Sequence, residues 1–236
     1  MNEKIVIHPQ VGKITIIRGA SNRTIRLSVH PSKGIRLSMP LSLPLRSAEK
    51  FIEERVPWIV KTQKKTESRA ELYKIDTSGG TVMKIIGGTI CFTAALNLNK
   101  ISVIRRGTNI SILHGHEHPR KTLLEALEKV LRIVAKSYLP ERVAILAKQY
   151  GFEYNRIFLK NNRSNWGSCS SKANINLNIH LMRLPQELCD HIILHELCHL
   201  KYRNHGPEFH KLLDKLNGGR EKEMSKAMRN YRPYLI

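Results

Sequence analysis

Apolar and polar residues alternate over residues 4–39, and many of the apolar positions hold β-branched side chains such as Ile14 and Ile16. Gly12 and the segment 31–34, Pro-Ser-Lys-Gly, interrupt the alternation with residues that favour turns. A period of two is typical of half-buried strands. This part of the chain therefore predicts three or four short antiparallel strands joined by turns.

After Pro44 the apolar residues recur at helical spacing, which predicts an amphipathic helix over about residues 48–64. Pro57 lies inside it and is a site for a kink. Residues 65–80 are polar and predict a loop. Short β segments follow near residues 82–86, 90–94, 101–105 and 109–113.

The histidine-rich segment 114–120 is interpreted as a connector and as the domain boundary. We expect residues 1–115 to form a β-rich N-terminal region with one helix, and residues 116–236 to form a second domain. Short histidine-rich tracts can bind metal, but the alternation of His114, His116 and His118 with Gly and Glu is more typical of an exposed loop. No internal repeat is recognised in the sequence.

The second half of the chain alternates between helical and strand patterns. Helical spacing predicts a helix from Pro119 to Tyr138 and, after a break at Pro140, a second one to about Tyr150. Strands are expected near 156–160 and 173–179. A helix from Pro185 to about Arg203 and two shorter helices, about 208–217 and 220–231, complete an α+β fold.

The net charge of the chain bears on which partners the protein can bind. The chain has 40 Lys and Arg against 19 Asp and Glu, a formal net charge of +21. Such a positive electrostatic field attracts polyanions. Nucleic acid, an anionic membrane surface and an acidic protein are all suitable partners. A basic surface without a polyanionic partner is an equally good interpretation, because net charge bears on association and not on fold.

Cysteine usage and the absence of a long apolar segment bear on the compartment. The four cysteines form no C-x-x-C pair, and Cys189 and Cys198 are expected to face different sides of one helix. The N-terminus has no apolar signal region, and no stretch approaches the ~20 apolar residues that a membrane span requires. We therefore expect a protein of the cytoplasm with no membrane span.

The segment 195–199, His-Glu-Leu-Cys-His, carries the strongest chemical signal. Residues at i and i+4 lie on one face of a helix, so both imidazoles can bind a single ion. Glu196 lies between them and can reach a water molecule on that ion, whose pKa zinc lowers to about 7. The pattern predicts zinc bound by His195 and His199, with Glu196 as general base.

A catalytic zinc site needs a third protein ligand. His205, Glu208 and His210 follow the motif, and we favour His205 because Asn204 and Gly206 allow the chain to turn back toward the metal. The spacing from the first histidine matches the metzincins, although Tyr202 stands where those proteins have glycine.

His191 lies one turn before His195 on the same helix face. A straight helix does not bring it to the same ion as the other histidines. It is interpreted as a partner of a ligand, as a substrate contact, or as an ordinary histidine on the helix surface.

Several motifs occur in order and resemble the YgjP-like metallopeptidase family, which is related to the SprT and WLM peptidases. They are Trp166-Gly167-Ser168-Cys169, residues 176–178, residues 195–200, Asn204-His205 and Phe209. The resemblance implies a zincin-like domain with one Zn²⁺ per chain, bound by His195, His199 and His205. It also implies that Trp166, Gly167, Ser168 and Cys169 lie beside the site, near a strand that pairs with an extended peptide substrate.

Two positions depart from the family pattern. Asn165 stands where the family commonly has arginine, and His210 stands where an aromatic residue is common. These departures leave the three histidines intact and affect only the contacts to substrate.

These observations favour a zinc metallopeptidase that hydrolyses peptide bonds with a zinc-activated water. A metal-dependent hydrolase of a nucleotide or another phosphate substrate is an alternative, because the same chemistry serves and the basic charge suits an anion. A basic nucleic-acid-binding protein with a structural metal is a third interpretation. A closed site with four protein ligands would favour the third, and an open site the first two.

Overall fold

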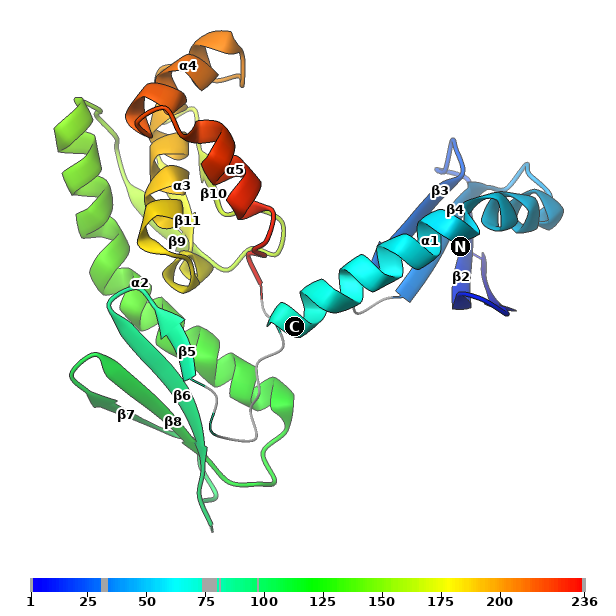
Figure 1. Cartoon of the computed structure of the whole chain (residues 1–236), viewed down its shortest axis with the longest axis horizontal. Helices are drawn as coiled ribbons and strands as arrows, with labels where there is room; N and C mark the ends of the chain where they lie inside the picture. Colours follow the sequence, from blue (N-terminus) through cyan, green and yellow to red (C-terminus); the bar gives the residue numbers. More distant parts are fainter. Residues whose placement is uncertain (1, 31–33, 74–79, 81, 97, 235–236) are drawn as a thin grey trace. The chain divides into compact units, whose positions relative to one another are not determined.

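The computed structural model describes residues 2–30, 34–73, 80, 82–96 and 98–234. It divides the chain into two compact units, residues 1–74 and 75–235 (Figure 1). The sequence placed the boundary at 115–116 instead. The difference arises because the strands of residues 82–114 share a hydrophobic core with the helix that follows them.

The first unit contains a four-stranded sheet in the order β1-β2-β4-β3. The strands are β1 (Asn2–His8), β2 (Gly12–Gly19), β3 (Arg26–His30) and β4 (Gly34–Pro40). The outer pairs are antiparallel, as expected, but β2 and β4 run parallel. The expectation of antiparallel pairing throughout is wrong for this central pair, because residues 20–25 carry the chain to the far edge and β4 returns beside β2.

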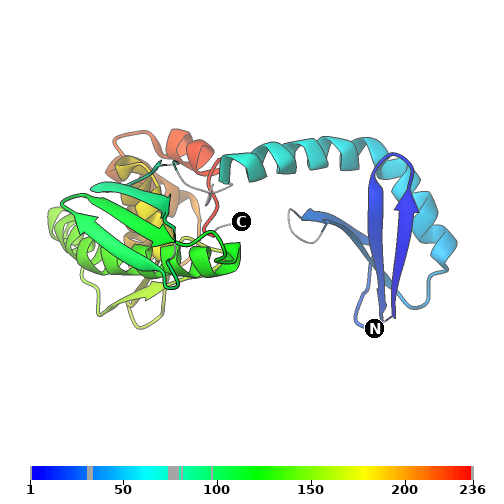
Figure 2. The ribbon, with the colours of Figure 1, turned by 90° about the horizontal axis from the view of Figure 1, so that it is seen from below.

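Helix α1 (Leu45–Tyr73) covers one face of this sheet (Figure 2). The two elements share a core that includes Ile16 and Leu37 from the sheet and Ile52 and Ile59 from the helix. The helix continues through Pro57 and beyond residue 64. The expected end at about residue 64 is wrong, because the polar segment that follows continues the helix to Tyr73. The glycines of the expected loop near residue 79 lie largely outside the described residues.

The second unit begins with β5 (Val82–Ile85), β6 (Gly88–Ala94), β7 (Ser102–Arg106) and β8 (Asn109–His114). All four strands were expected from the sequence. Their order is β5-β6-β8-β7, again with antiparallel outer pairs and a parallel central pair. A long helix follows, as in the first unit, so the two units repeat one topology. Alternation alone does not reveal this repeat, because it specifies strands and not their pairing.

Helix α2 (Arg120–Tyr150) is a single helix, where the sequence predicted two helices separated at Pro140. Proline removes one backbone hydrogen bond and tends to kink a helix. Leu139 and Val143, on either side, are both fully buried, and their packing stabilises the continuous helix. The sheet β5–β8 lies against its N-terminal half, and the remaining elements gather around its C-terminal half (Figure 1).

These remaining elements form a three-stranded sheet in the order β10-β11-β9 and three helices. The strands are β9 (Ile157–Lys160), β10 (Gly167–Cys169) and β11 (Ile175–Asn178), followed by the short helix η1 (Ile179–Arg183). The helices are α3 (Gln186–Cys198), α4 (Pro207–Leu216) and α5 (Glu221–Met228). Mixed helices and sheets of this kind confirm the α+β fold class.

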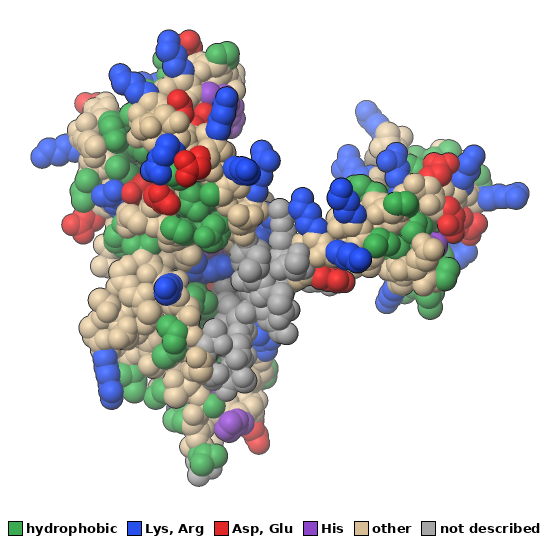
Figure 3. All heavy atoms as spheres, in the orientation of Figure 1, with side chains coloured by type: hydrophobic (Ala, Val, Ile, Leu, Met, Phe, Trp, Pro, Cys, Tyr) green, Lys and Arg blue, Asp and Glu red, His purple; other side chains and the backbone are tan. Residues whose placement is uncertain are grey.

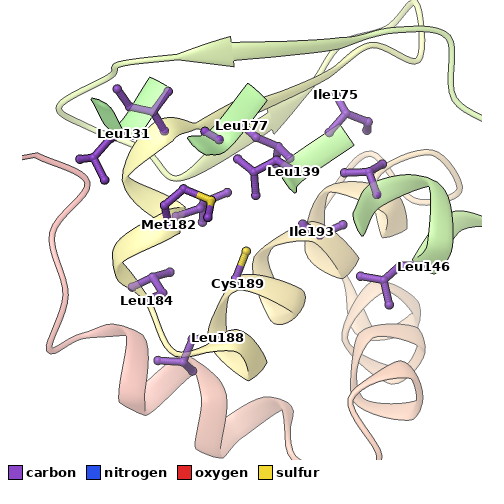
Figure 4. Packing of buried hydrophobic residues seen from close by; sticks show 14 of the residues in the cluster. Leu131, Leu139, Leu146, Ile175, Leu177, Met182, Leu184, Leu188, Cys189 and Ile193 are labelled. Carbon is purple, nitrogen blue, oxygen red and sulfur yellow. The ribbon is translucent and has the colours of Figure 1, made fainter. Parts of the chain in front are cut away.

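Helix α3 is anchored on both sides by buried contacts. Leu139 of α2, Leu177 of β11 and Ile193 of α3 converge in one hydrophobic cluster (Figure 4). At the surface, Arg142 of α2 donates two hydrogen bonds to Asp190 of α3, both at 2.7 Å. The position of the helix that carries the His-Glu motif is therefore fixed by packing and by a bidentate ion pair.

None of the described helices is both long enough and apolar enough to cross a membrane.

Candidate metal centre

Helix α3 places the two histidines of the motif at its C-terminal end. The helix ends at Cys198 and His199 is its C-cap, several residues before the expected end near Arg203. The ring centroids of His195 and His199 lie 5.0 Å apart. Nδ1 of His199 lies 3.1 Å from the carbonyl oxygen of Tyr202, so a proton on Nδ1 donates to that carbonyl and leaves Nε2 free to bind a metal.

The turn after α3 brings His205 back to this pair. Its Nε2 atom lies 3.0 Å from Nε2 of His195, and its ring centroid lies 4.7 Å from that of His199. Potential ligand atoms of the three histidines all lie within 4.8 Å of one another. Of the three residues considered as the third ligand, His205 is the one that lies beside His195 and His199.

Glu208 and His210 are placed elsewhere. Glu208 is exposed on α4, and Nδ1 of His210 lies 2.6 Å from a carboxylate oxygen of Glu221. His210 therefore has its own partner, at the start of α5.

Phe209 forms a base beneath the three histidines. Its ring centroid lies 4.9 Å from that of His195, 4.7 Å from that of His199 and 4.7 Å from that of His205. Phe209 is fully buried. Its ring fixes the three imidazoles from below, and the sequence analysis gave it no role of its own. Phe209 lies in the first turn of α4, and its place there in the ordered motifs is the signal that could have found this contact.

The electrostatic setting favours the neutral form of His195 and His205. Burial, followed by the neighbouring His199 and His205, lowers the pKa of His195 to about 3. Burial also lowers the pKa of His205, and His199 and His210 add to this effect. Neutral imidazoles are the form that binds a metal ion, so the donor set fits a divalent transition metal.

Glu196 lies buried beside the histidines, with 5% of its surface exposed. Burial raises its pKa to about 8, and within the described chain its Oε2 atom has no hydrogen-bond partner. A buried carboxylate needs a nearby positive charge to ionise readily, and no charged neighbour in the described chain offsets the effect of burial on the pKa of Glu196. A bound cation would supply that charge, which is a second observation in favour of a metal.

Gly167 gives Glu196 its space. A Cβ atom built on Gly167 would lie 2.7 Å from both Cγ and Oε1 of Glu196. Only glycine allows β10 to approach the carboxylate this closely. The group that β10 meets at this position is therefore the carboxylate side chain of Glu196.

The other residues expected beside the site take different positions around β10. Burial raises the pKa of the Cys169 thiol, with Arg203 acting in the opposite direction and Glu196 in the same one. Asn176 of β11 donates to Oγ of Ser168 at 3.1 Å. Because side chains alternate along a strand, Ser168 points to the face opposite Gly167 and Cys169. Trp166 is half-buried and packs against the core.

His191 is 3% exposed, so the interpretation as a surface histidine is wrong. Its Nδ1 atom lies 3.3 Å from Oδ1 of Asn217, and this contact holds the end of α4 against α3. Its burial also leaves no surface for a substrate contact.

Arg203 is a further residue that the sequence analysis gave no role. It lies between His199 and His205 and donates hydrogen bonds to the carbonyl oxygens of Ser170 and Ser171, at 2.7 and 3.1 Å. These carbonyls directly follow β10. The side chain therefore joins the turn that carries the third histidine to the strand that contacts Glu196. Nothing in a single sequence indicates this long-range pair.

The histidine-rich segment after β8 is not part of this centre. His114 is 4% exposed, and Nδ1 of His118 lies 3.1 Å from the backbone nitrogen of Gly115. Among the described residues, the group that could hold a metal ion is His195, His199 and His205.

A His-Glu-x-x-His helix with a third histidine and a buried glutamate is the kind of site found in metal-dependent peptidases. The chain belongs to the YgjP-like family: the model described as "YgjP-like, metallopeptidase domain" matches residues 23–230. The resemblance noted in the sequence is thereby confirmed, and the family indicates a metallopeptidase.

Two solved structures are also similar to part of the chain. The metallopeptidase zymogen jannalysin of Methanocaldococcus jannaschii is 26% identical, with 38% of this chain and 92% of that chain covered and a TM-score of 0.35. The metallopeptidase zymogen abylysin of Pyrococcus abyssi is 19% identical, with 41% and 98% covered and a TM-score of 0.36. The search of curated proteins gave no match.

Proposed function

We propose that this protein is a zinc peptidase in which His195, His199 and His205 hold the metal and Glu196 is the general base. The observation that carries the proposal is the convergence of three ligand atoms within 4.8 Å of one another, beside a buried carboxylate whose Oε2 has no partner in the described chain. When bound, zinc polarises a carbonyl group and lowers the pKa of water to about 7.

Residues of the chain itself transfer the proton and hold the ligands in position. Glu196 accepts a proton from the attacking water at its free oxygen and passes it to the leaving amine. Phe209 and the carbonyl of Tyr202 hold the imidazoles in place.

Strand β10 supports an extended peptide as substrate. It pairs with β11 on one side and, within the described chain, with no strand on the other. A peptide can add to such an edge through main-chain hydrogen bonds. Gly167 on this strand lies against Glu196, so a peptide paired with β10 would pass beside the general base.

The test separates metal binding from catalysis. Glu196→Gln should retain metal and fold but reduce peptide hydrolysis by at least about 100-fold, because an amide cannot accept the proton. Metal content by elemental analysis and turnover of a peptide library are the two measurements. Unchanged turnover would exclude Glu196 as the base, and turnover of phosphate esters alone would favour the alternative hydrolase.

The same metal measurement tests the third ligand. His205→Ala should lose most of its zinc, whereas His210→Ala, in α4, should keep it. The reverse result would assign the third ligand to His210. Full zinc content together with no hydrolysis of any substrate by the unaltered protein would favour a structural metal.

A further inference from the structure

A cavity of about 460 Å³ lies between the loop that leads into β10 and the end of α5 with the segment that follows it. Its lining includes three arginines and three aromatic residues, namely Arg163, Arg229, Arg232, Trp166, Tyr231 and Tyr234. None of the other described lining residues is acidic. The cavity is therefore positively charged, with aromatic walls.

Two of the guanidinium groups are available to a ligand. Within the described chain, the guanidinium groups of Arg163 and Arg229 form no hydrogen bond or ion pair, and that of Arg232 donates only to the carbonyl of Tyr231, at 3.2 Å. The side chains of Arg163 and Arg229 are both exposed, and like charges that line one open cavity repel one another. An anion in the cavity would remove this repulsion and accept hydrogen bonds from the planar guanidinium forks.

The walls of the cavity are held by buried hydrogen bonds. Asn178, which is 1% exposed, donates from Nδ2 to the carbonyls of Asn162 at 2.7 Å, Asn165 at 3.0 Å and Pro233 at 3.2 Å. Arg183 donates to the carbonyl of Tyr234 at 3.2 Å. One side chain thus ties the loop before β10 to the C-terminal segment, so the shape of the cavity exists before any ligand arrives.

The cavity adjoins the catalytic edge. Trp166, in its lining, directly precedes Gly167, which lies against Glu196. An extended peptide advances by about 3.3 Å per residue. A peptide paired with β10 would therefore reach the cavity within a few residues of the scissile bond.

We infer that this cavity is a substrate subsite that binds a carboxylate of the peptide, and so makes the protein selective for acidic substrates. This inference rests on the proposed peptidase function. A carboxylate matches the guanidinium fork in a bidentate manner, while the indole of Trp166 covers the aliphatic part of the residue that carries it. The carboxylate comes either from an Asp or Glu side chain or from the C-terminus of the substrate.

Trp166 provides a binding signal that does not depend on catalysis. The chain has 2 tryptophans, and the other, Trp58, is 44% exposed in the first unit. Trp58→Phe in the full chain, combined with Glu196→Gln to prevent cleavage, leaves Trp166 as the single tryptophan, which is excited selectively over the tyrosines. The probes are three matched peptides. The first contains Glu and has a blocked C-terminus, the second has Gln in place of Glu, and the third is the Gln peptide with a free C-terminal carboxylate.

We expect the Glu peptide or the free-carboxylate peptide to quench the Trp166 fluorescence saturably. The blocked Gln peptide should bind at least about tenfold more weakly. The two carboxylate peptides distinguish the side chain from the C-terminus as the source. Arg163→Gln and Arg229→Gln should each weaken carboxylate binding about tenfold. Arg220→Gln, which removes an exposed arginine paired with Glu187, is the matched control and should bind as before.

Equal binding of the three peptides, or unchanged binding by both arginine variants, would overturn the inference. Tighter binding of inorganic phosphate than of either carboxylate peptide would overturn it as well. Failure of the proposed function gives a different result: carboxylate-dependent binding persists, but the protein with its native Glu196 hydrolyses none of the peptides.

Discussion

Gly167 shows how a single missing side chain shapes the catalytic centre. A methyl group at this position would overlap the Glu196 side chain, with Cγ and Oε1 both 2.7 Å away. Gly167→Ala should therefore displace the carboxylate, lowering kcat by at least about tenfold with little change in zinc content. Peptide turnover and elemental analysis measure the two effects.

The matched control is Gly206→Ala, beside His205. A Cβ atom there meets nothing within 4 Å, and the backbone φ of −79° is ordinary. This variant should keep both zinc and activity. Full activity of Gly167→Ala would mean that Glu196 is free to move away without loss.

His180 is a buried residue whose protonation state the geometry fixes. Arg183 donates to Nδ1 at 3.1 Å, and Nε2 lies 3.0 Å from Oδ1 of Asn161, to which it donates. The ring is therefore neutral, and burial, followed by the charge of Arg183, lowers its pKa to about 3.

Acid should accordingly destabilise the protein through His180. Because the unfolded chain has a histidine pKa of about 6.5, it binds the proton first, and the stability is lost as pH falls from about 6.5 toward 3. The free energy of unfolding should fall by up to about 1.4 kcal/mol per pH unit from this group. His180→Gln should remove that part of the slope in urea denaturation with a chelator present. Parallel slopes for both proteins would contradict it.

At the residue scale, the sequence predicted the part of the metal centre that follows from the spacing of residues along a helix. The i, i+4 spacing placed His195 and His199 together, and the structure brings His205 to them. Gly167 was expected beside the site, but its contact with Glu196 was not, because that contact depends on how β10 packs against α3. The burial of His191 was missed, because it depends on Asn217 and hence on how α4 packs.

At the scale of elements, Arg203 links the turn after α3 to the chain that follows β10. Arg203→Ala removes the hydrogen bonds to Ser170 and Ser171, so the turn and the edge strand can shift relative to each other. We expect kcat to fall about tenfold or more, with weaker zinc binding, because His205 loses its support. Zinc affinity by competition with a chelator and steady-state kinetics provide the measurements.

Arg220→Ala serves as the control, since its ion pair with Glu187 is exposed and involves none of the three histidines. Arg203→Lys should restore part of the activity, because an ammonium group reaches one carbonyl but not two in fork geometry. An unchanged zinc affinity and kcat in Arg203→Ala would remove any positioning role.

Strands and helices were predicted well where periodicity was strong and poorly where proline intervened. Pro140 lies between Leu139 and Val143, which are both fully buried. Tertiary packing of these side chains outweighs the lost hydrogen bond and keeps α2 continuous. Propensity carries no information about such packing, so the predicted break was reasonable locally but wrong. The parallel pairing of β2 with β4 was missed for a related reason, since alternation is the same in both directions.

At the scale of the whole molecule, the net charge of +21 is the property with the widest consequences. Figure 3 shows Lys and Arg side chains spread over the visible face of each unit, with acidic and apolar side chains between them. We expect weak, salt-sensitive binding of DNA and RNA without sequence preference, falling steeply between low and physiological salt because counterions are released. Fluorescence anisotropy with labelled single- and double-stranded oligonucleotides measures it. Tight binding at physiological salt would instead identify nucleic acid as a functional partner, and no binding at low salt would refute the prediction.

The repeated strand order also has a consequence for how the chain folds. In each sheet two hairpins form from neighbouring segments, and hairpins of this kind close in about 1–10 μs. They then join through a parallel pair, in which Ile14 meets Ile35 and Ile90 meets Ile110. Joining requires closure of a longer loop, which is slower than hairpin formation. The docking of two preformed hairpins should therefore limit the folding rate of each sheet, and substitutions at Ile14 or Ile90 should slow refolding more than substitutions in the hairpin turns.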